Sequence, residues 1–326
     1  MTATQALEAP VQETPAGSPS APPRRPRLRR PPRPRPARTG PDLRPVAEWT
    51  VVPTRVLLTC AVLAGWVLLY VLVISRVQEQ HSQQGLYDTF RQRLAAQTAP
   101  VGGRIAVGAP VALIDIPEVG VHRIVVVEGT AAGVMRSGPG HLRNTPLPGQ
   151  AGVSVIFGRA VMFGAPFSGI AQLQPGDRYT VTTGQGVFTY VVSGVREDGD
   201  PVPLPLAAGG ARLTLITATG QGGQSGLAPN KALYVDSELS GKPQPTPAGR
   251  PGAVDAAESQ LAVDKSEHVF IQLILCLQLA IVLAVGFAWG WNRWDRRKLW
   301  LGGVPVFVAV LWGLSSTASQ LLPNLL

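Results

Sequence analysis

Three long runs of apolar residues constrain this chain more than any other feature of its sequence. The first run holds 19 uncharged residues, the second holds 23, and the last 28 residues of the sequence also carry no charge. About 20 apolar residues cross the hydrocarbon core of a bilayer as a helix. The first run is too long, and begins too far along the chain, for a typical cleaved signal peptide. We therefore expect three transmembrane helices, over residues 55–75, 268–291 and 299–322.

The positive charge of the chain lies beside these apolar runs. Of the formal net charge of +9, residues 1–55 contribute +6 and residues 292–298 contribute +3. Because basic segments are retained on the cytoplasmic side, we expect both to be cytoplasmic and the region between the first two helices to be extracytoplasmic. The Pro- and Arg-rich tail, residues 1–54, is predicted to be disordered and could bind anionic membrane lipid. The remainder has no net charge, which argues against a nucleic-acid partner.

Residues 105–240 have a different pattern, typical of an all-β barrel or sandwich. Short β-branched runs alternate with Gly and Pro turns. Only short helices fit between them, near residues 130–136 and 166–173. The predicted strands have the sequences VALIDI, HRIVVVEG, GVSVIFG, RYTVTT, VFTYVVSGV, RLTLIT and KALYVDS.

Two polar segments flank this predicted domain. Residues 76–104 are expected to form a stalk, with a helix that has Leu86, Phe90 and Leu94 on one face. Residues 241–267 are rich in Pro, Gly and Ala, and this composition predicts a linker to the second apolar run.

Several sequence blocks of the predicted β-domain resemble the extracytoplasmic domain of sortases. The blocks are LIDIPEVGVHRIVVVEGT, GPGHLRNTPLPGQAGVSVIFG, FGAPFSGIAQLQPGDRYTV, FTYVVSG and RLTLIT, and they occur in this order over residues 110–239. Sortases are cell-surface transpeptidases of Gram-positive bacteria. The resemblance implies a closed barrel of about eight strands with short helices, joined to a membrane anchor.

The positions that carry sortase chemistry differ in this chain. In the family, a Cys at the end of a TLxTC strand attacks the substrate carbonyl, a His shuttles protons, and an Arg stabilises the oxyanion. The matching positions hold Ala218, Arg159 and either Lys231 or Ala232, because NKALYV can be aligned in two ways. Alanine cannot attack a carbonyl, and arginine stays charged at biological pH. The resemblance therefore implies a pseudoenzyme that keeps the scaffold without its catalytic groups.

Three hydroxyl side chains near these positions are candidate replacements for the missing nucleophile. Thr217 and Thr219 flank the Cys position, and Ser225 follows in the next loop. A hydroxyl nucleophile needs an adjacent base. The predicted domain offers only His122, within a strand, and His141, in a segment that resembles a structural turn. We expect neither histidine to act as that base.

The sequence predicts no metal or cofactor. The loop GQGGQSG, residues 220–226, lacks the Gly-Lys-Ser/Thr ending of a phosphate-binding loop. Cys60 and Cys276 lie within apolar runs, where small packing residues are expected. Acidic residues are scattered without the spacing of a ligand set: Asp115, Glu118 and Glu128.

Three functions are compatible with these features. The first is a binding or scaffolding role, in which a groove holds an extended peptide by main-chain hydrogen bonds. Its cationic side chains would suit a carboxylate or an anionic glycan. The residues expected to line this groove are Arg159, Thr217, Thr219 and Lys231.

The second function is a sortase-type transpeptidase or hydrolase with an unfamiliar nucleophile, acting on surface-protein sorting signals. The third is a subunit of a membrane assembly. In that case Gly302, Gly303 and the small residues of the run 313–316 could pack against another helix. We favour an inactive sortase-like membrane protein that binds membrane or cell-surface proteins or peptides.

Overall fold

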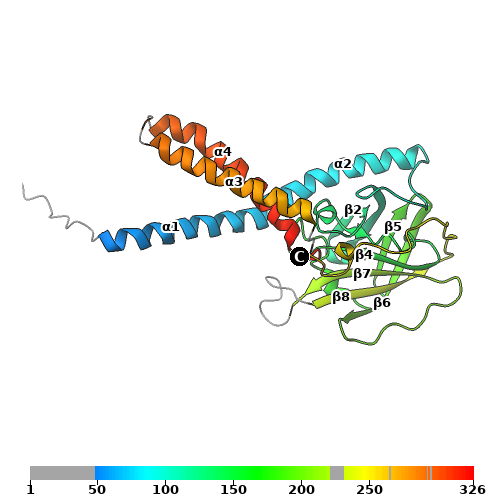
Figure 1. Cartoon of the computed structure of the whole chain (residues 1–326). Helices are drawn as coiled ribbons and strands as arrows, with labels where there is room; N and C mark the ends of the chain where they lie inside the picture. Colours follow the sequence, from blue (N-terminus) through cyan, green and yellow to red (C-terminus); the bar gives the residue numbers. More distant parts are fainter. Residues whose placement is uncertain (1–47, 221–230, 264–265, 292, 294–295) are drawn as a thin grey trace, which may run out of the picture. The chain divides into compact units, whose positions relative to one another are not determined.

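A computed structural model describes residues 48–220, 231–263, 266–291, 293 and 296–326 (Figure 1). Ser225 and all but the first residue of the loop 220–226 lie outside these residues, as does the tail 1–47. Contacts divide the chain into two compact units, residues 1–54 and 55–326. Of the first unit, only residues 48–54 are described, and they begin helix α1.

Eight strands of the described chain close into a barrel in the order β1-β2-β3-β4-β7-β8-β6-β5. The pairs β2–β3 and β4–β7 are parallel and the other pairs are antiparallel. The closed barrel of about eight strands is thus confirmed. The strands are β1 (Pro110–Ile116), β2 (Val121–Glu128), β3 (Gly140–His141), β4 (Gly152–Phe157), β5 (Arg178–Thr183), β6 (Gly186–Glu197), β7 (Ala211–Thr219) and β8 (Lys231–Ser240).

The barrel core follows from the alternation of side chains along each strand. Leu213 and Leu215 of β7 belong to the central buried cluster, as do Leu233 and Val235 of β8. The residues between them point to the outer face of the barrel. Short 3-10 helices lie within the two regions where helical pieces were predicted, at Val134–Arg136 and Ile170–Gln172.

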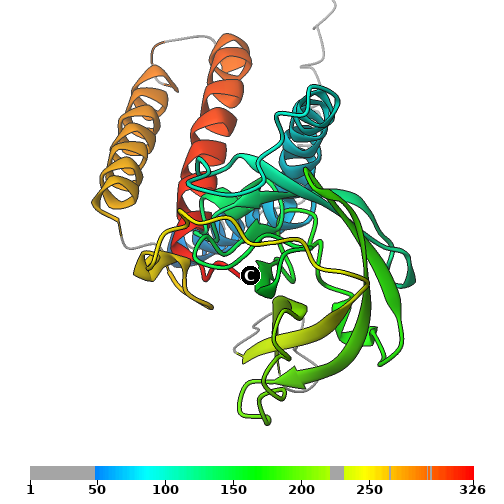
Figure 2. The ribbon, with the colours of Figure 1, turned by 90° about the vertical axis from the view of Figure 1, so that its right-hand side faces the viewer.

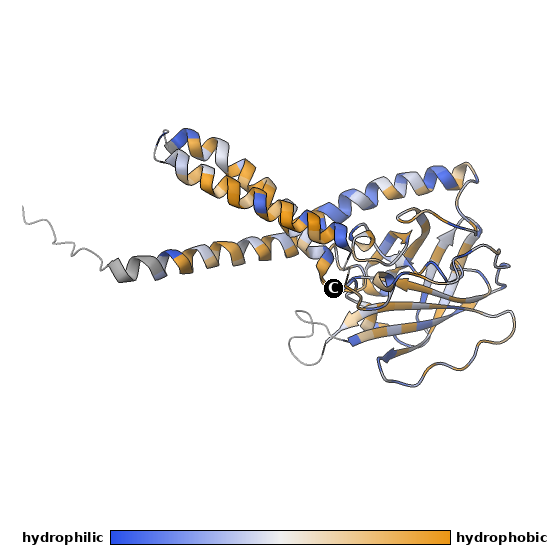
Figure 3. Ribbon diagram, viewed as in Figure 1, coloured by the Kyte–Doolittle hydropathy of each residue, from blue (hydrophilic) through white to orange (hydrophobic). Residues whose placement is uncertain are grey.

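The long helices show that the expected all-β class is wrong for the chain as a whole. Helix α1 (Glu48–Leu69) continues through the π-helix η1 (Tyr70–Ile74) into α2 (Ser75–Ala95), and α3 (Glu267–Trp291) is followed by α4 (Arg296–Ala318). Figure 3 shows that α1, α3 and α4 are mainly apolar, whereas α2 is mainly polar. The predicted class described the barrel alone, although the same prediction included three transmembrane helices.

Three helical stretches within the described residues have the length and composition to cross a membrane. They are Pro53–Ala95, Glu267–Trp291 and Arg297–Leu321. The first includes α2, whose polar residues follow the apolar part. Each stretch overlaps one of the runs predicted as transmembrane.

Helix α2 packs against the barrel through the face that the sequence predicted. Phe90 is buried there, and Leu86 and Leu94 are half-buried. The side-chain amide of Gln83 donates to the carbonyl oxygen of Val125 at 3.0 Å and accepts from the Val125 N–H at 2.8 Å. An unpaired strand edge exposes such groups. Gln83 therefore satisfies the part of β2 that the short strand β3 leaves uncovered.

Helices α3 and α4 lie side by side (Figure 2). A side chain at Gly303 would approach the ring of Phe287 to 2.7 Å, so glycine allows this close contact. Ser315 of α4 accepts a hydrogen bond from Trp66 of α1 at 3.0 Å. Two of the small residues expected to pack against another helix thus do so within this chain. For Gly302, no atom of the described residues lies within 4 Å of an added Cβ.

Candidate functional site

The Cys position of the expected triad lies one residue before the end of β7. Ala218 is paired directly with Ala232 of β8. Side chains of directly opposed residues in an antiparallel pair project from the same face. Both alanines are buried, in a cluster on the outer face that also contains Phe157, Ile216 and Tyr234. This pair presents two methyl groups, neither of which can attack a carbonyl or stabilise an anion.

The strand register distinguishes between the two candidates for the Arg position. Lys231 is paired with Thr219, so its side chain leaves the opposite face of β8 from that of Ala232. The Lys231 Nζ atom lies 3.8 Å from a carboxylate oxygen of Glu197. Ala232 is therefore the residue placed beside Ala218, and Lys231 is directed elsewhere.

Arg159 follows β4 and occupies the position expected for the catalytic His. Its side chain is only 1% exposed. The guanidinium donates to the carbonyl oxygens of Ala132 at 2.7 Å and Met135 at 3.3 Å. It also lies over the ring of Phe163, at 4.9 Å from the ring centre. Arg159 thus fastens the segment around residues 132–135 to the end of β4.

The charge of Arg159 is unsuited to proton transfer near neutral pH. Burial, together with the nearby cation Arg136, lowers the pKa of Arg159 to about 10. The side chain therefore remains a cation at pH 7. The expectation that Arg159 lines an open groove is wrong, because the side chain is enclosed rather than available to an anionic ligand.

The two threonines beside Ala218 face the opposite side of β7. Thr217 is buried, and its hydroxyl donates to the carbonyl oxygen of Gly158 at 2.9 Å. Thr219 follows two residues later and projects from the same face. Of the four residues expected to line a groove, Thr217, Thr219 and Lys231 project from one face of the β7–β8 pair, and Arg159 is enclosed after β4. The strand alternation separates the two threonines and Lys231 from Ala218.

Neither His122 nor His141 forms a hydrogen bond with Thr217 or Thr219. His122 is exposed, and its Nδ1 lies 3.3 Å from a carboxylate oxygen of Asp115. His141 is fully buried, with Nδ1 at 3.0 Å from Glu128 Oε2 and Nε2 at 2.9 Å from the carbonyl oxygen of Pro146. The hydroxyl of Thr145 also lies 3.2 Å from Nε2, so both ring nitrogens of His141 are engaged by groups other than Thr217 and Thr219.

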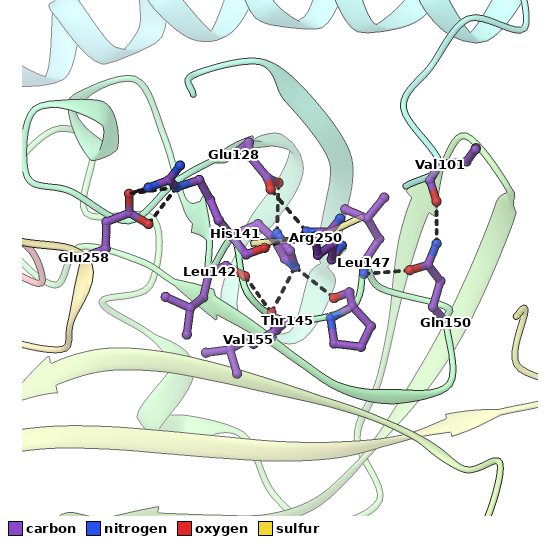
Figure 4. Close-up of polar contacts among 12 residues, drawn as sticks. Val101, Glu128, His141, Leu142, Thr145, Leu147, Gln150, Val155, Arg250 and Glu258 are labelled. Carbon is purple, nitrogen blue, oxygen red and sulfur yellow. Dashed lines mark hydrogen bonds and ion pairs between the residues drawn. The ribbon is translucent and has the colours of Figure 1, made fainter. Parts of the chain in front are cut away.

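The His141 contacts extend into a buried ionic cluster that the sequence did not predict (Figure 4). Arg250 Nη1 lies 3.1 Å from Glu128 Oε1, and Arg143 forms a second ion pair with the buried Glu258. Arg250 and Glu258 belong to the segment predicted as a linker, whose described part thus packs on the barrel. The cluster was missed because Glu128 lies 122 residues from Arg250, and no local pattern connects them.

Among the residues that the structure describes, no group of three or more His, Cys, Asp or Glu could hold a metal ion.

Comparison with known proteins identifies the barrel. Residues 114–228 match the family model of the sortase domain. The chain belongs to the sortase family. A sortase D5 transpeptidase of Clostridium perfringens is 25% identical, with 49% of this chain and 99% of that chain covered and a TM-score of 0.40. Sortase E of Streptomyces avermitilis is 30% identical, with 42% and 91% covered and a TM-score of 0.34. A search of curated proteins gave no match.

Within this sortase domain, none of the residues at the three expected catalytic positions carries the side chain of the family. Ala218 and Ala232 adjoin one another on the outer face, and Arg159 is held by the backbone carbonyls of Ala132 and Met135. The three expected positions lie just after β4, near the end of β7 and near the start of β8. The side chains that they carry offer packing and an internal tether in place of a nucleophile, a base and an exposed cation.

Proposed function

We propose that this protein is a catalytically inactive sortase-like membrane protein that binds other membrane or cell-surface proteins or peptides. The observation that carries this proposal is the pair of buried methyl groups at Ala218 and Ala232. Acyl transfer by the family's mechanism needs a thiol and a cation at these positions. The buried, hydrogen-bonded Arg159 supports the same function, since it cannot replace an imidazole as a proton shuttle.

We further propose a multi-pass topology with a cytoplasmic N-terminus and an extracytoplasmic barrel. The three apolar helical stretches support it, and so do the basic segments next to them. The first helix leaves the cytoplasm before the barrel. Helix α3 then returns to the basic segment 292–298, and α4 crosses to the barrel side again.

Thiol labelling in intact cells tests this topology. With Cys60 and Cys276 replaced by Ala, a Val187→Cys variant should react with a membrane-impermeant maleimide, because Val187 is 67% exposed on the barrel. A Thr39→Cys variant, in the basic tail, should react only after the membrane is permeabilised. Labelling of Thr39→Cys in intact cells, or protection of Val187→Cys, would contradict the proposed orientation.

A cleavage assay tests the proposed lack of catalysis. Purified full-length protein in detergent, incubated with fluorogenic sorting-signal peptides, should release no more product than the peptide alone. The alternative function, a sortase-type enzyme with a hydroxyl nucleophile, predicts cleavage that is lost in a Thr217→Val, Thr219→Val or Ser225→Ala variant. Such cleavage would contradict the proposed function.

A further inference from the structure

The outer face beside Ala218 is covered by a distant part of the same chain. Leu325 is fully buried, and it belongs to the same apolar cluster as Ala218, Ala232, Phe157 and Tyr234. It lies in the segment 322–326, which follows α4 and a short 3-10 helix. The surface where a sortase needs access to its nucleophile is therefore occupied.

Main-chain hydrogen bonds hold this segment beside the position of the lost catalytic His. The N–H of Ala160 donates to the carbonyl oxygen of Leu325 at 2.9 Å, and the N–H of Met162 donates to that of Leu326 at 2.9 Å. Such contacts do not depend on the side chains of the bound segment. They are the usual means by which a protein holds an extended peptide.

Asn324 gives the same segment a specific anchor. Its side chain is fully buried, and its amide donates to the carbonyl oxygens of Thr130 at 2.9 Å and Ser259 at 2.8 Å. Its own N–H donates to the carbonyl oxygen of Ala262 at 2.9 Å. A buried amide with two side-chain hydrogen bonds is expensive to displace. The segment thus combines an apolar side chain in a buried cluster, main-chain hydrogen bonds and a polar anchor.

The helix pair α3–α4 explains how the segment reaches this place. The crossing by α1 is enough to hold the barrel at the membrane. A crossing by α3 alone would leave the residues after it on the cytoplasmic side, away from the barrel. The second crossing of the pair, by α4, returns the chain to the side of the membrane on which the barrel lies. Arg136 of the barrel also donates to Ser316 near the end of α4 at 2.5 Å, next to the segment. This step rests on the proposed function, because it uses the proposed topology.

We propose that residues 322–326 are an intramolecular ligand of the surface beside Ala218, and that this surface accepts an extended peptide of another protein only after they leave. The peptide that fits places an apolar side chain where Leu325 now packs and an amide side chain directly before it. A tethered ligand has an effective concentration of about millimolar. A micromolar peptide with the same intrinsic affinity therefore does not displace the segment from the intact protein.

Thiol accessibility of the full chain in detergent tests the proposal. In a background with Cys60 and Cys276 replaced by Ala, an Ala218→Cys variant should react slowly with a maleimide. Deletion of residues 322–326 should raise the labelling rate about tenfold or more, because local opening is no longer required. The control variant Val187→Cys should react at the same rate with and without the deletion. Equal Ala218→Cys rates with and without residues 322–326 would overturn the proposal.

A matched pair of substitutions separates release of the segment from general damage. Leu325→Asp should expose Ala218→Cys as the deletion does, because burying an unpaired carboxylate in the apolar cluster around Ala218 is unfavourable. Leu322→Asp should leave the labelling rate unchanged, because Leu322 is 39% exposed. Equal effects of the two substitutions would contradict the role assigned to Leu325. Thermal unfolding of each variant shows whether the barrel remains folded.

Peptide addition then tests whether the uncovered surface is a binding site. The synthetic peptide SQLLPNLL, with the sequence of residues 319–326, should slow labelling of Ala218→Cys in the deletion variant. The same peptide with alanine in place of Asn should protect much less. If the unchanged peptide SQLLPNLL gave no protection, the peptide-site proposal would be overturned. Cleavage of sorting-signal peptides would overturn the proposed function and leave these accessibility results untouched.

Discussion

Replacing Glu128 by glutamine should lower the free energy of unfolding of the barrel by about 3–5 kcal/mol, the usual cost of removing one partner from a buried ion pair. The Glu128 side chain is 1% exposed, and its two oxygens contact His141 at 3.0 Å and Arg250 at 3.1 Å. Glutamine keeps the shape but loses the charge. The Arg250 guanidinium, 8% exposed, would then remain buried without its carboxylate.

Thermal unfolding of the full-length protein in detergent measures this effect, and a midpoint lower by on the order of 10 °C is expected. Glu118→Gln is the matched control, because Glu118 is exposed and its substitution should change stability by less than about 0.5 kcal/mol. Equal melting of the two variants would show that the buried cluster does not hold the segment around Arg250 to the barrel.

Replacing Arg159 by alanine should also be strongly destabilising, by on the order of 3 kcal/mol, because each buried carbonyl left unpaired costs about 1–3 kcal/mol. The carbonyl oxygens of Ala132 and Met135 would both lose their donor. The ring of Phe163 would lose the cation that lies over it. If Arg159 instead served an exposed ligand groove, its removal would leave the folded barrel almost unchanged.

Arg178→Ala provides the control for this substitution. Arg178 is exposed at the start of β5, so the same change of residue type should cost less than about 0.5 kcal/mol. Both variants should be compared by thermal unfolding of the full chain in detergent. A stability loss for Arg159→Ala no greater than that for Arg178→Ala would contradict the tethering role of Arg159.

Local patterns were sufficient to predict most of the barrel and the apolar helices. Alternating β-branched runs marked seven of the eight described strands, because each run has enough residues to show the period of two. Strand β3, Gly140–His141, has two residues and therefore no detectable period. The sequence also predicts that Ala218 and Arg159 stand at sortase catalytic positions, since Ala218 lies near the end of one strand with a family-like sequence and Arg159 follows another.

Contacts between distant residues account for what the sequence did not predict. The register of β7 and β8 places Ala232 beside Ala218, and neither strand alone reveals it. The sequence also gave no sign that Arg159 is enclosed, because its partners come from the segment 132–135. Leu325 lies more than a hundred residues from Ala218, and its uncharged surroundings suggested only the end of a membrane helix.

The intact mass of the wild-type protein, after incubation with a sorting-signal peptide, tests the central claim most directly. Acyl transfer by a sortase-type nucleophile passes through a covalent acyl-enzyme, which adds the mass of the acyl fragment to the chain. Because the nucleophile position holds the buried Ala218, we expect the mass to remain that of the unmodified chain in both the full-length protein and the variant lacking residues 322–326. A mass increase equal to the acyl fragment in either protein would contradict the absence of catalysis.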